Sequence, residues 1–394
     1  MALSSEQRDW LTLTLVPGVG TTAFIQLLAR FRTPGNVLRA SQGELEDVVG
    51  RKLAGRIVQY TDVADTAGQE AAITKHGVQV ITLEDPMYPL RLAEIYDPPL
   101  LLFVRGDIRP EDDRCVAIVG TRRASSYGLR AAEAFARDLA SRGVTVVSGM
   151  ASGIDAAAHR GAIDGGGRTI AVLGNGVDVT YPRQHEELMQ DIIRHGCVMS
   201  QFAMGVEPSP GHFPYRNRII SGMSMGTLIV EAPERSGALI TARRAAEQGR
   251  EVFAVPGAIG SVNSLGPHRL IQEGAKLVQH VDDILVELDL ASDAPETRTP
   301  PAPLEHHMTR RDAVPPEATG RADDPGQSRG PSPVPANLSH QEEAVLSSLN
   351  PDGSYVDEIA GACRIAISEA LSALTHLELK GLVRQFSGKR FARR

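Results

Sequence analysis

Between residues 115 and 288, short apolar runs alternate with amphipathic helical sequence, and this alternation constrains the fold more than any other feature of the chain. Several of the runs end in glycine. They are CVAIVG (115–120), VTVVSG (144–149), RTIAVLG (168–174), CVMSQF (197–202), GTLIVEA (226–232) and EVFAVPG (251–257). Near-continuous apolar strands separated by helices predict a mostly parallel sheet that is covered on both faces. We therefore expect an α/β, Rossmann-like, doubly wound domain.

The turns after these strands are rich in residue types that bind anions. GTRRASSYG (120–128) follows the first strand, SGMASGIDAAAHRGA (148–162) the second and LGNGVDVTYP (173–182) the third. In a doubly wound sheet such turns meet at the carboxyl edge, where ligands bind. Glycines let the backbone approach a ligand, while arginines and the N–H groups of helix starts bind phosphate. The sequence therefore predicts a phosphate-binding edge.

The stretch 212–241 adds a further turn to this edge. It places Arg216 and Arg218 on either side of Asn217, then passes through a predicted helix and strand to a second turn at 234–237. Two loop-to-helix junctions that are rich in guanidinium groups and unpaired backbone N–H groups favour an anion as the ligand.

Patterns for nucleotide chemistry are missing from these turns. GTRRAS is not GxGxxG, no acidic residue closes the second strand, and there is no GxxxxGK[ST], so neither NAD nor P-loop chemistry is expected. His159 follows Asp155 by four residues, but a helix-surface pair or a packing contact is favoured over acid-base chemistry because no nucleophile or metal ligand accompanies the pair. Glu231 and Glu234 are the best catalytic carboxylates, unless they only orient neighbouring arginines and loop N–H groups. We expect no cofactor and no metal.

Composition restricts the partners and the compartment. The net charge of −7 argues against a globally basic nucleic-acid coat but is compatible with a local basic groove. Cys115, Cys197 and Cys363 form no CxxC pair, which favours free thiols in a reducing compartment. The start lacks a basic leader, and no apolar run approaches the roughly 18 residues of a spanning helix. We expect a cytoplasmic protein with no membrane contact.

The N-terminal part, 1–76, is predicted to be a small α-helical domain of the helix-hairpin-helix or SAM-like type. Residues 5–31 predict two helices around the turn VPGVG (16–20), whose N–H groups could bind a DNA phosphate. The turn contains no Lys or Arg, so a packing module without DNA contact is equally supported. Short strands and Pro-rich turns follow from Val78 and predict an extension of the main sheet, within a Rossmann-like domain at 77–290.

The C-terminal part divides into a linker and a small domain. The Pro-, Ala-, Asp-, Gly- and Ser-rich segment 291–336 has no periodicity and predicts a disordered linker. Residues 337–394 read as three helices and a β-wing, the pattern of a winged helix. The third helix has few basic residues, whereas the wing and tail have several, which favours contact with a DNA backbone or a protein over base reading. Duplex DNA contact by the terminal domains is possible.

Six segments together resemble the DNA-processing protein A (DprA/Smf) family. They are IVGTRRASSYG, SGMASGIDAAAHRGA, VLGNGVDVTYP, FPYRNRIISGMS, IVEAPERSGALITA and REVFAVPG, and they cover the chain almost continuously from about 85 to 288. The resemblance implies a non-enzymatic protein that binds single-stranded DNA and loads RecA recombinase on it in natural transformation. It also implies a homodimer.

The resemblance further implies which residues bind the DNA. Arg122 would hold a phosphate bidentately with help from Ser125, and Phe213 would stack on an unpaired base. Stacking tolerates any base, which suits an unspecific binder. The full set implied by the family is Arg122, Ser125, Ser148, Gly149, Gly153, Phe213, Arg216, Asn217 and Arg218.

Two other hypotheses are consistent with the sequence. A nucleotide-binding enzyme of the phosphoribohydrolase type uses a related Rossmann-like fold, and SGMSMGTLIVEAPERSGALITA resembles its PGGxGTxxE loop. Here GMSMGT replaces PGG, and Glu231 stands three residues later than expected of the acid. The third hypothesis is a scaffold whose winged helix binds promoters.

Overall fold

The computed structural model describes residues 3–61, 65–290, 339–349, 354–363, 365, 370, 373, 374, 377, 380, 382–386 and 390–393. The predicted linker at 291–336 lies outside these residues. The chain divides into two compact units, Met1–Pro300 and Pro301–Arg394, which are described separately. Within the described residues, no helix combines the length and the apolar character needed to cross a membrane.

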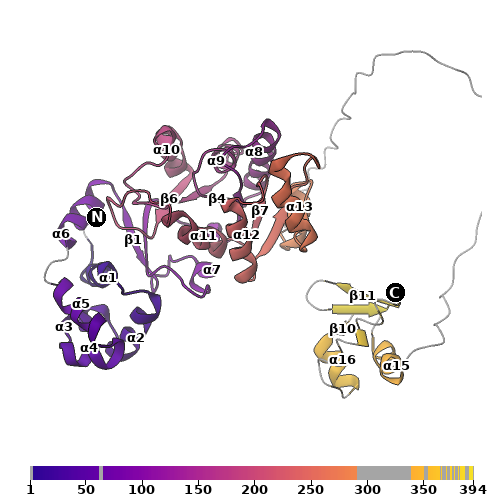
Figure 1. Cartoon of the computed structure of the whole chain (residues 1–394), viewed down its shortest axis with the longest axis horizontal. Coiled ribbons are helices and arrows are strands. Elements are labelled where there is room, and N and C mark those ends of the chain that lie inside the picture. The colour runs from indigo at the N-terminus through magenta and orange to yellow at the C-terminus, as the bar shows by residue number, and fades with distance from the viewer. Residues whose placement is uncertain are drawn as a thin grey trace, which may run out of the picture. The chain divides into compact units, whose positions relative to one another are not determined.

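Nine strands form the sheet in the described part of the first unit, in the order β1-β2-β6-β5-β4-β3-β7-β8-β9 (Figure 1). β1 pairs with β2, and β2 with β6, in antiparallel fashion, while the remaining neighbours are parallel. This confirms the predicted Rossmann-like fold class. The bounds are β1 Gln79–Thr82, β2 Leu101–Gly106, β3 Cys115–Val119, β4 Thr145–Ser148, β5 Thr169–Val172, β6 Gly196–Ser200, β7 Gly226–Ile229, β8 Glu251–Ala254 and β9 Lys276–Leu277.

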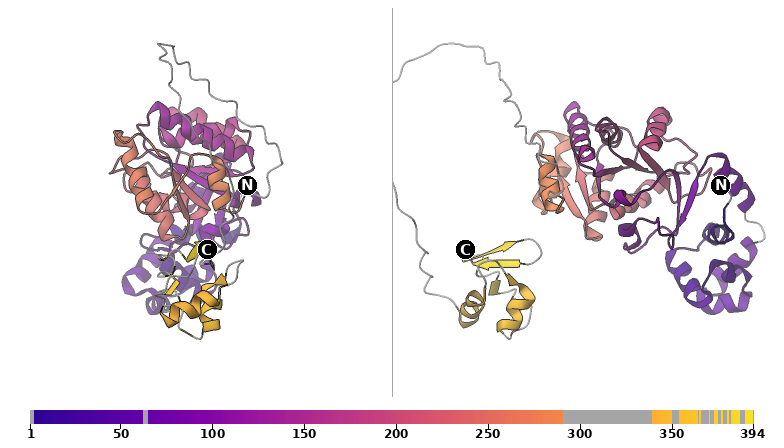
Figure 2. Two further views of the ribbon diagram at one scale, coloured as in Figure 1. Left: turned by 90° about the vertical axis from the view of Figure 1, so that its right-hand side faces the viewer. Right: turned by 180° about the vertical axis from the view of Figure 1, so that it is seen from behind.

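Helices cover both faces of this sheet (Figures 1 and 2). Along β3, Val116 and Ile118 pack into the core on the α8 and α9 side, and Ala117 and Val119 into the core on the α11 and α12 side. This period of two is what a strand buried on both faces requires. The helices are α7 Leu90–Ala93, α8 Ser126–Ser141, α9 Ile154–Asp164, α10 Glu186–His195, α11 His212–Met223, α12 Gly237–Glu247, α13 Leu265–Gln272 and α14 Val281–Glu287.

The order of the strands reverses between β3 and β7. The chain moves outward from β3 through β4, β5 and β6, then returns to the other side of β3 with β7. Ligands of doubly wound sheets bind outside the carboxyl ends of the strands at such a point. Glycines let the turns converge there: a Cβ at Gly153, whose φ is +81°, would lie 2.4 Å from the Thr121 carbonyl oxygen.

The predicted pair of helices around residues 16–20 is present, and it belongs to the same compact unit as the sheet. A capping box between Ser4 and Gln7 starts α1. Trp10 lies with its ring centroid 4.6 Å from that of Phe24, and the helices share a core with β1 and β2. The bounds are α1 Ser5–Leu15, α2 Thr21–Phe31, α3 Pro34–Arg39, α4 Gln42–Val49, α5 Arg51–Thr61 and α6 Thr66–Lys75.

The second unit has a three-stranded antiparallel sheet in the order β10-β12-β11. Its described elements are α15 His340–Ser347, β10 Ser354–Tyr355, α16 Val356–Cys363, β11 Val383–Phe386 and β12 Arg390–Arg393. Leu374 and Leu377 belong to its core, but most of the segment predicted to form the third helix lies outside the described residues. The division of the chain at 76, 290 and 336 stays a prediction.

Candidate functional site

A cavity of about 360 Å³ lies at the reversal point of the sheet. Its walls come from the turn after β3 (119–123), the first turns of α11 and the junction of β7 with α12 (233–241). Ala151 and Asp155 from the turn and helix after β4 complete it. Three of the turns that the sequence placed at one edge, those after β3, β4 and β7, therefore meet around one cavity, whereas the turn at 173–182 contributes no lining residue.

Guanidinium groups dominate the charge around this cavity. Arg122, Arg123 and Arg235 are exposed lining residues, and in the described part of the chain none of their guanidinium groups has a hydrogen-bond or ion-pair partner. Asp155 is the one acidic lining residue among the described residues. Unpaired, exposed guanidinium groups with converging positions suit a polyanion that accepts bidentate hydrogen bonds.

Arg216 is built into the wall of the cavity, with only 4% of its surface exposed. Its guanidinium group donates to the carbonyl oxygens of Gly149, at 3.1 Å, and Val172. A Cβ at position 149 would lie 2.7 Å from Arg216 Nη2, so only glycine fits there. Burial lowers the pKa of Arg216 to about 10. Arg216 thus braces the turn after β4 and keeps its positive charge beside the cavity.

Asp155 is buried next to this guanidinium group. Its Oδ2 accepts from the backbone N–H groups of Gly149, at 3.2 Å, and Ala151, at 3.4 Å. Burial raises the pKa of Asp155 to about 6, against the opposing effect of the Arg216 charge. At neutral pH the carboxylate is therefore mostly ionised and offsets part of the positive charge.

Phe213 presents an aromatic ring at the same cavity. The Arg122 guanidinium carbon lies 5.2 Å from the ring centroid, and a Cβ at Gly174 would lie 2.9 Å from Phe213 Cδ1. The ring therefore packs against the bare backbone of the turn after β5 while remaining partly exposed. A fixed, partly exposed ring beside arginines can stack on a flat ligand group.

Four of the nine expected site residues line the cavity, and the other five lie elsewhere. Arg122, Phe213, Arg216 and Asn217 are the lining residues. Ser148 is fully buried and donates to the Ile118 carbonyl oxygen, at 2.6 Å, inside the sheet. Gly149 and Gly153 contribute backbone behind the wall, because they let the turns approach each other.

Arg218 does not line the cavity. Its Nε lies 3.3 Å from Asp97 Oδ2, its Nη2 donates to Gln201 Oε1 at 2.9 Å, and its guanidinium carbon lies 4.1 Å from the Tyr215 ring centroid. Asp97 also accepts from Thr21 Oγ1 at 2.6 Å. The polar contacts of Arg218 therefore connect α11 to the start of α2.

Ser125 caps α8 and is held by Glu231. Its N–H and its Oγ donate to the two carboxylate oxygens of Glu231, at 2.9 Å and 2.5 Å, and Asn263 Nδ2 donates to the same carboxylate at 3.2 Å. Glu231 is buried and does not line the cavity. The structure therefore gives this carboxylate the orienting role that the sequence offered beside catalysis.

His159 is also fully buried, and its partner is Thr169 rather than Asp155. Thr169 Oγ1 donates to the Val146 carbonyl oxygen at 2.8 Å, so it must accept from His159 Nδ1 at 2.7 Å. His159 Nε2 has no partner among the described residues, and burial lowers the pKa of the imidazole to about 3. His159 is therefore a neutral imidazole that packs in the core, and packing was favoured over acid-base chemistry for this residue.

Three charged lining residues were absent from the expected set: Arg123, Arg235 and Asp155. Arg123 directly follows Arg122, and Arg235 stands in the loop APERSG, which begins α12. The position of that loop directly after a strand was the sequence signal that could have pointed to Arg235 as a lining residue. Asp155 gave no such signal, because its relation to Gly149 depends on the tertiary fold.

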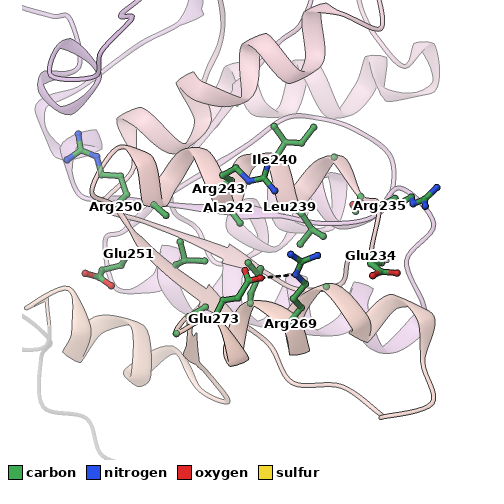
Figure 3. A pocket seen from close by; sticks show the side chains of 18 residues that line it. Glu234, Arg235, Leu239, Ile240, Ala242, Arg243, Arg250, Glu251, Arg269 and Glu273 are labelled. Carbon is green, nitrogen blue, oxygen red and sulfur yellow. Dashed lines mark hydrogen bonds and ion pairs between the residues drawn. The ribbon is translucent and has the colours of Figure 1, made fainter.

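A second cavity, of about 650 Å³, lies among α12, β8 and α13 (Figure 3). Its lining mixes acidic and basic side chains, and two of its arginines are already paired. Arg269 Nε lies 2.8 Å from Glu273 Oε1, and Arg250 Nη2 donates to the Arg91 carbonyl oxygen at 2.8 Å. Its charge is therefore more nearly balanced than that of the cavity at the reversal point.

These features define a class: a Rossmann-like protein with an arginine-lined cavity at the reversal point of its sheet and no GxGxxG sequence in its first turn. The model of the DNA recombination-mediator protein A family matches residues 79–289, and the model of the DprA winged helix domain matches residues 329–389. The chain belongs to the DNA recombination-mediator protein A family, which confirms the resemblance of its motifs to the DprA/Smf proteins.

Relatives and a solved structure agree with this assignment. Protein Smf of Synechocystis is 33% identical over 404 residues, which cover 99% of this chain and 100% of that protein. DNA processing protein DprA of Bacillus subtilis is 42% identical over 219 residues, 55% of this chain and 74% of that protein. The X-ray structure of DprA from Streptococcus pneumoniae matches 73% of this chain and 99% of that chain, with 36% identity and a TM-score of 0.63.

Proposed function

We propose that this protein binds single-stranded DNA at the cavity beside α11. The observation that carries the proposal is the group of unpaired guanidinium groups of Arg122, Arg123 and Arg235 around the partly exposed ring of Phe213. Phosphates of a strand would bind the guanidinium groups, and an unpaired base would stack on the ring. In a duplex the base faces are occupied by neighbouring bases, so the ring has nothing to bind.

We propose further that binding is not followed by catalysis. Glu231, the carboxylate of the phosphoribohydrolase hypothesis, accepts hydrogen bonds from Ser125 and Asn263 on both of its oxygens. Following the family resemblance, we propose that the protein is a cytoplasmic homodimer. It would protect the bound strand and load RecA on it in natural transformation. The name of the family refers to recombination mediation and that of its Bacillus subtilis relative to DNA processing, and both support this role.

Fluorescence anisotropy tests strand binding. A labelled oligo-dT and a duplex of equal length are titrated with the protein at two salt concentrations. We expect tighter binding of the single strand, and weaker binding at high salt because each phosphate contact releases a counterion. Equal or tighter binding of the duplex, or binding that ignores salt, would contradict the proposal.

RecA loading needs its own experiment. Single-stranded DNA is first covered with single-strand-binding protein, and RecA filament growth is followed with and without the protein. We expect the protein to shorten the lag before filament growth. An unchanged lag, in a preparation that binds the oligo-dT, would limit the function to strand binding.

A further inference from the structure

Tyr181 stands next to the partly exposed ring of Phe213. The two ring centroids are 5.5 Å apart, with the ring planes tilted by 32°. Tyr181 does not line the cavity, yet 37% of its surface is exposed. Arg122, Phe213 and Tyr181 thus form a continuous row of one guanidinium group and two rings.

The loop that presents Tyr181 is fixed by its own hydrogen bonds. Asn175 Nδ2 donates to the carbonyl oxygens of Val179, at 2.6 Å, and Gly176, at 3.0 Å. After the tyrosine, the buried His185 donates from Nδ1 to the Met150 carbonyl oxygen at 2.9 Å. The ring is therefore held in place before any ligand arrives, which lowers the entropic cost of binding to it.

Tyr181 is not needed to fill the core. It belongs to none of the buried clusters of the described residues, and its hydroxyl group has no hydrogen-bond partner there. Two residues later, Arg183 is exposed and has no ion-pair partner in the described part of the chain. Tyr181 and Arg183 thus place an exposed ring and an unpaired cation close together in the sequence. Phe213 and Arg122 place the same two kinds of group close together in space.

We propose that Tyr181 is a second stacking position for a base of the bound strand, next to the base on Phe213, and that Arg183 binds a phosphate beyond it. This rests on the proposed binding of single-stranded DNA and extends it from one base to at least two. Successive bases stacked on aromatic side chains along a basic groove are a general mode of single-strand binding without sequence preference.

The first test compares Tyr181→Ala, Tyr181→Phe and the control Tyr96→Ala in the full-length protein. Tyr96 is fully exposed and has no ring contact among the described residues. Stacking contributes about 1–3 kcal/mol per base, so Tyr181→Ala should weaken binding of oligo-dT by roughly 5- to 150-fold. Tyr181→Phe and Tyr96→Ala should bind as the wild type does, and circular dichroism should show that all variants are folded.

The second test separates direct stacking from mere support of Phe213. If Tyr181 contacts a base itself, Tyr181→Ala should still weaken binding at least threefold in a Phe213→Ala background. On an abasic oligonucleotide of the same length, wild type and Tyr181→Ala should bind equally.

Two outcomes overturn the inference: wild-type affinity in Tyr181→Ala, or loss of the tyrosine's effect once Phe213 is alanine. In either case binding of oligo-dT by the wild type would leave the proposed function standing. If the wild type binds no single-stranded DNA, both the inference about Tyr181 and the proposed function are wrong.

Discussion

At the scale of single residues, the site combines exposed cations with one buried carboxylate. Asp155 faces Arg216 of α11 and Arg122 of the turn after β3, and its pKa is raised to about 6 by burial. The ionised carboxylate repels a phosphate that approaches these guanidinium groups, whereas its protonated form does not. The affinity for an anionic strand should therefore depend on pH.

We expect oligo-dT binding to tighten severalfold as the pH falls from about 8 to about 5, because Asp155 becomes protonated in this interval. Asp155→Asn mimics the protonated side chain, so it should bind more tightly than the wild type at the higher pH. It should also show less pH dependence. Anisotropy titrations at constant ionic strength measure both quantities, and identical pH profiles of the two proteins would exclude Asp155 as the cause.

The raised pKa of Asp155 should also make the free energy of unfolding depend on pH. A carboxyl group whose pKa rises from 3.8 to about 6 on folding binds protons more tightly in the folded state. Its contribution to the free energy of unfolding is thus fully present below pH 3.8 and is lost as the pH rises through 6. Urea denaturation should show the stability of Asp155→Asn, relative to wild type, increasing with pH through this window. A constant difference would show that the carboxyl group titrates outside it.

Substitutions of Glu231 test how much a buried carboxylate outside the cavity contributes to stability. Glu231→Ala removes the acceptor of both the Ser125 N–H and the Ser125 hydroxyl group, while Asn263 Nδ2 keeps the Arg123 carbonyl oxygen, so unfolding should cost about 2–3 kcal/mol less. Glu231→Gln keeps an acceptor for the Ser125 N–H and should lose less than half of that. Urea denaturation measures both variants. Equal stability of Glu231→Ala and wild type would show that these hydrogen bonds contribute little.

At the scale of elements, α11 has two functional faces. Arg216 and Asn217 follow Phe213 by three and four residues, so all three can line the cavity from one side of the helix. Tyr215 and Arg218 lie on another face and contact Asp97, which also accepts from Thr21 at the start of α2. Through Asp97, the helix at the site is fastened to the N-terminal helices.

Asp97→Ala should loosen this connection. It removes the carboxylate partner of the buried Arg218 and leaves Thr21 Oγ1 only the Pro98 carbonyl oxygen as acceptor, so we expect a loss of about 1 kcal/mol and faster hydrogen exchange at the start of α2. Hydrogen-exchange mass spectrometry of peptides from α2 and from β3 gives the comparison. Exchange in β3 should stay slow, and unchanged exchange in α2 would contradict the connection.

The sequence was informative about elements and less so about side-chain directions. Each apolar run became a strand, and all but β8 are buried along their whole length, because runs such as CVAIVG are covered on both faces. Arg122 and Phe213 could be placed because turns after parallel strands share an edge. Ser148 and Arg218 could not, since both depend on which face of a strand or helix turns toward the cavity. β9, with two residues, is too short to give a pattern.

At the scale of the whole first unit, the sheet and the N-terminal helices share one core. Trp10 and Phe24 belong to the same buried cluster as Val80 and Phe103 of β1 and β2. These strands continue the main sheet through the pairing of β2 with β6. Removal of the helices would therefore expose an apolar surface of the sheet, and the two parts should unfold together.

Trp10 is the single tryptophan of the chain, so its fluorescence reports on the helices alone. We expect its urea midpoint to coincide with the midpoint at which peptides of β3 and β7 lose protection in hydrogen exchange, as two-state unfolding requires. Trp10→Ala should lower the stability of both parts together, by about 3–5 kcal/mol. Two separate midpoints would show instead that the helices unfold independently.

The most direct test of the account is the effect of Arg122→Ala on strand binding. Arg194→Ala removes an equal charge from α10, where Arg194 pairs with Asp191, and serves as the matched control. Anisotropy with oligo-dT and its duplex should show that Arg122→Ala loses single-strand affinity and part of the salt dependence, while Arg194→Ala binds as the wild type does. Undiminished single-strand binding by Arg122→Ala would contradict the account and place the DNA contact outside this cavity.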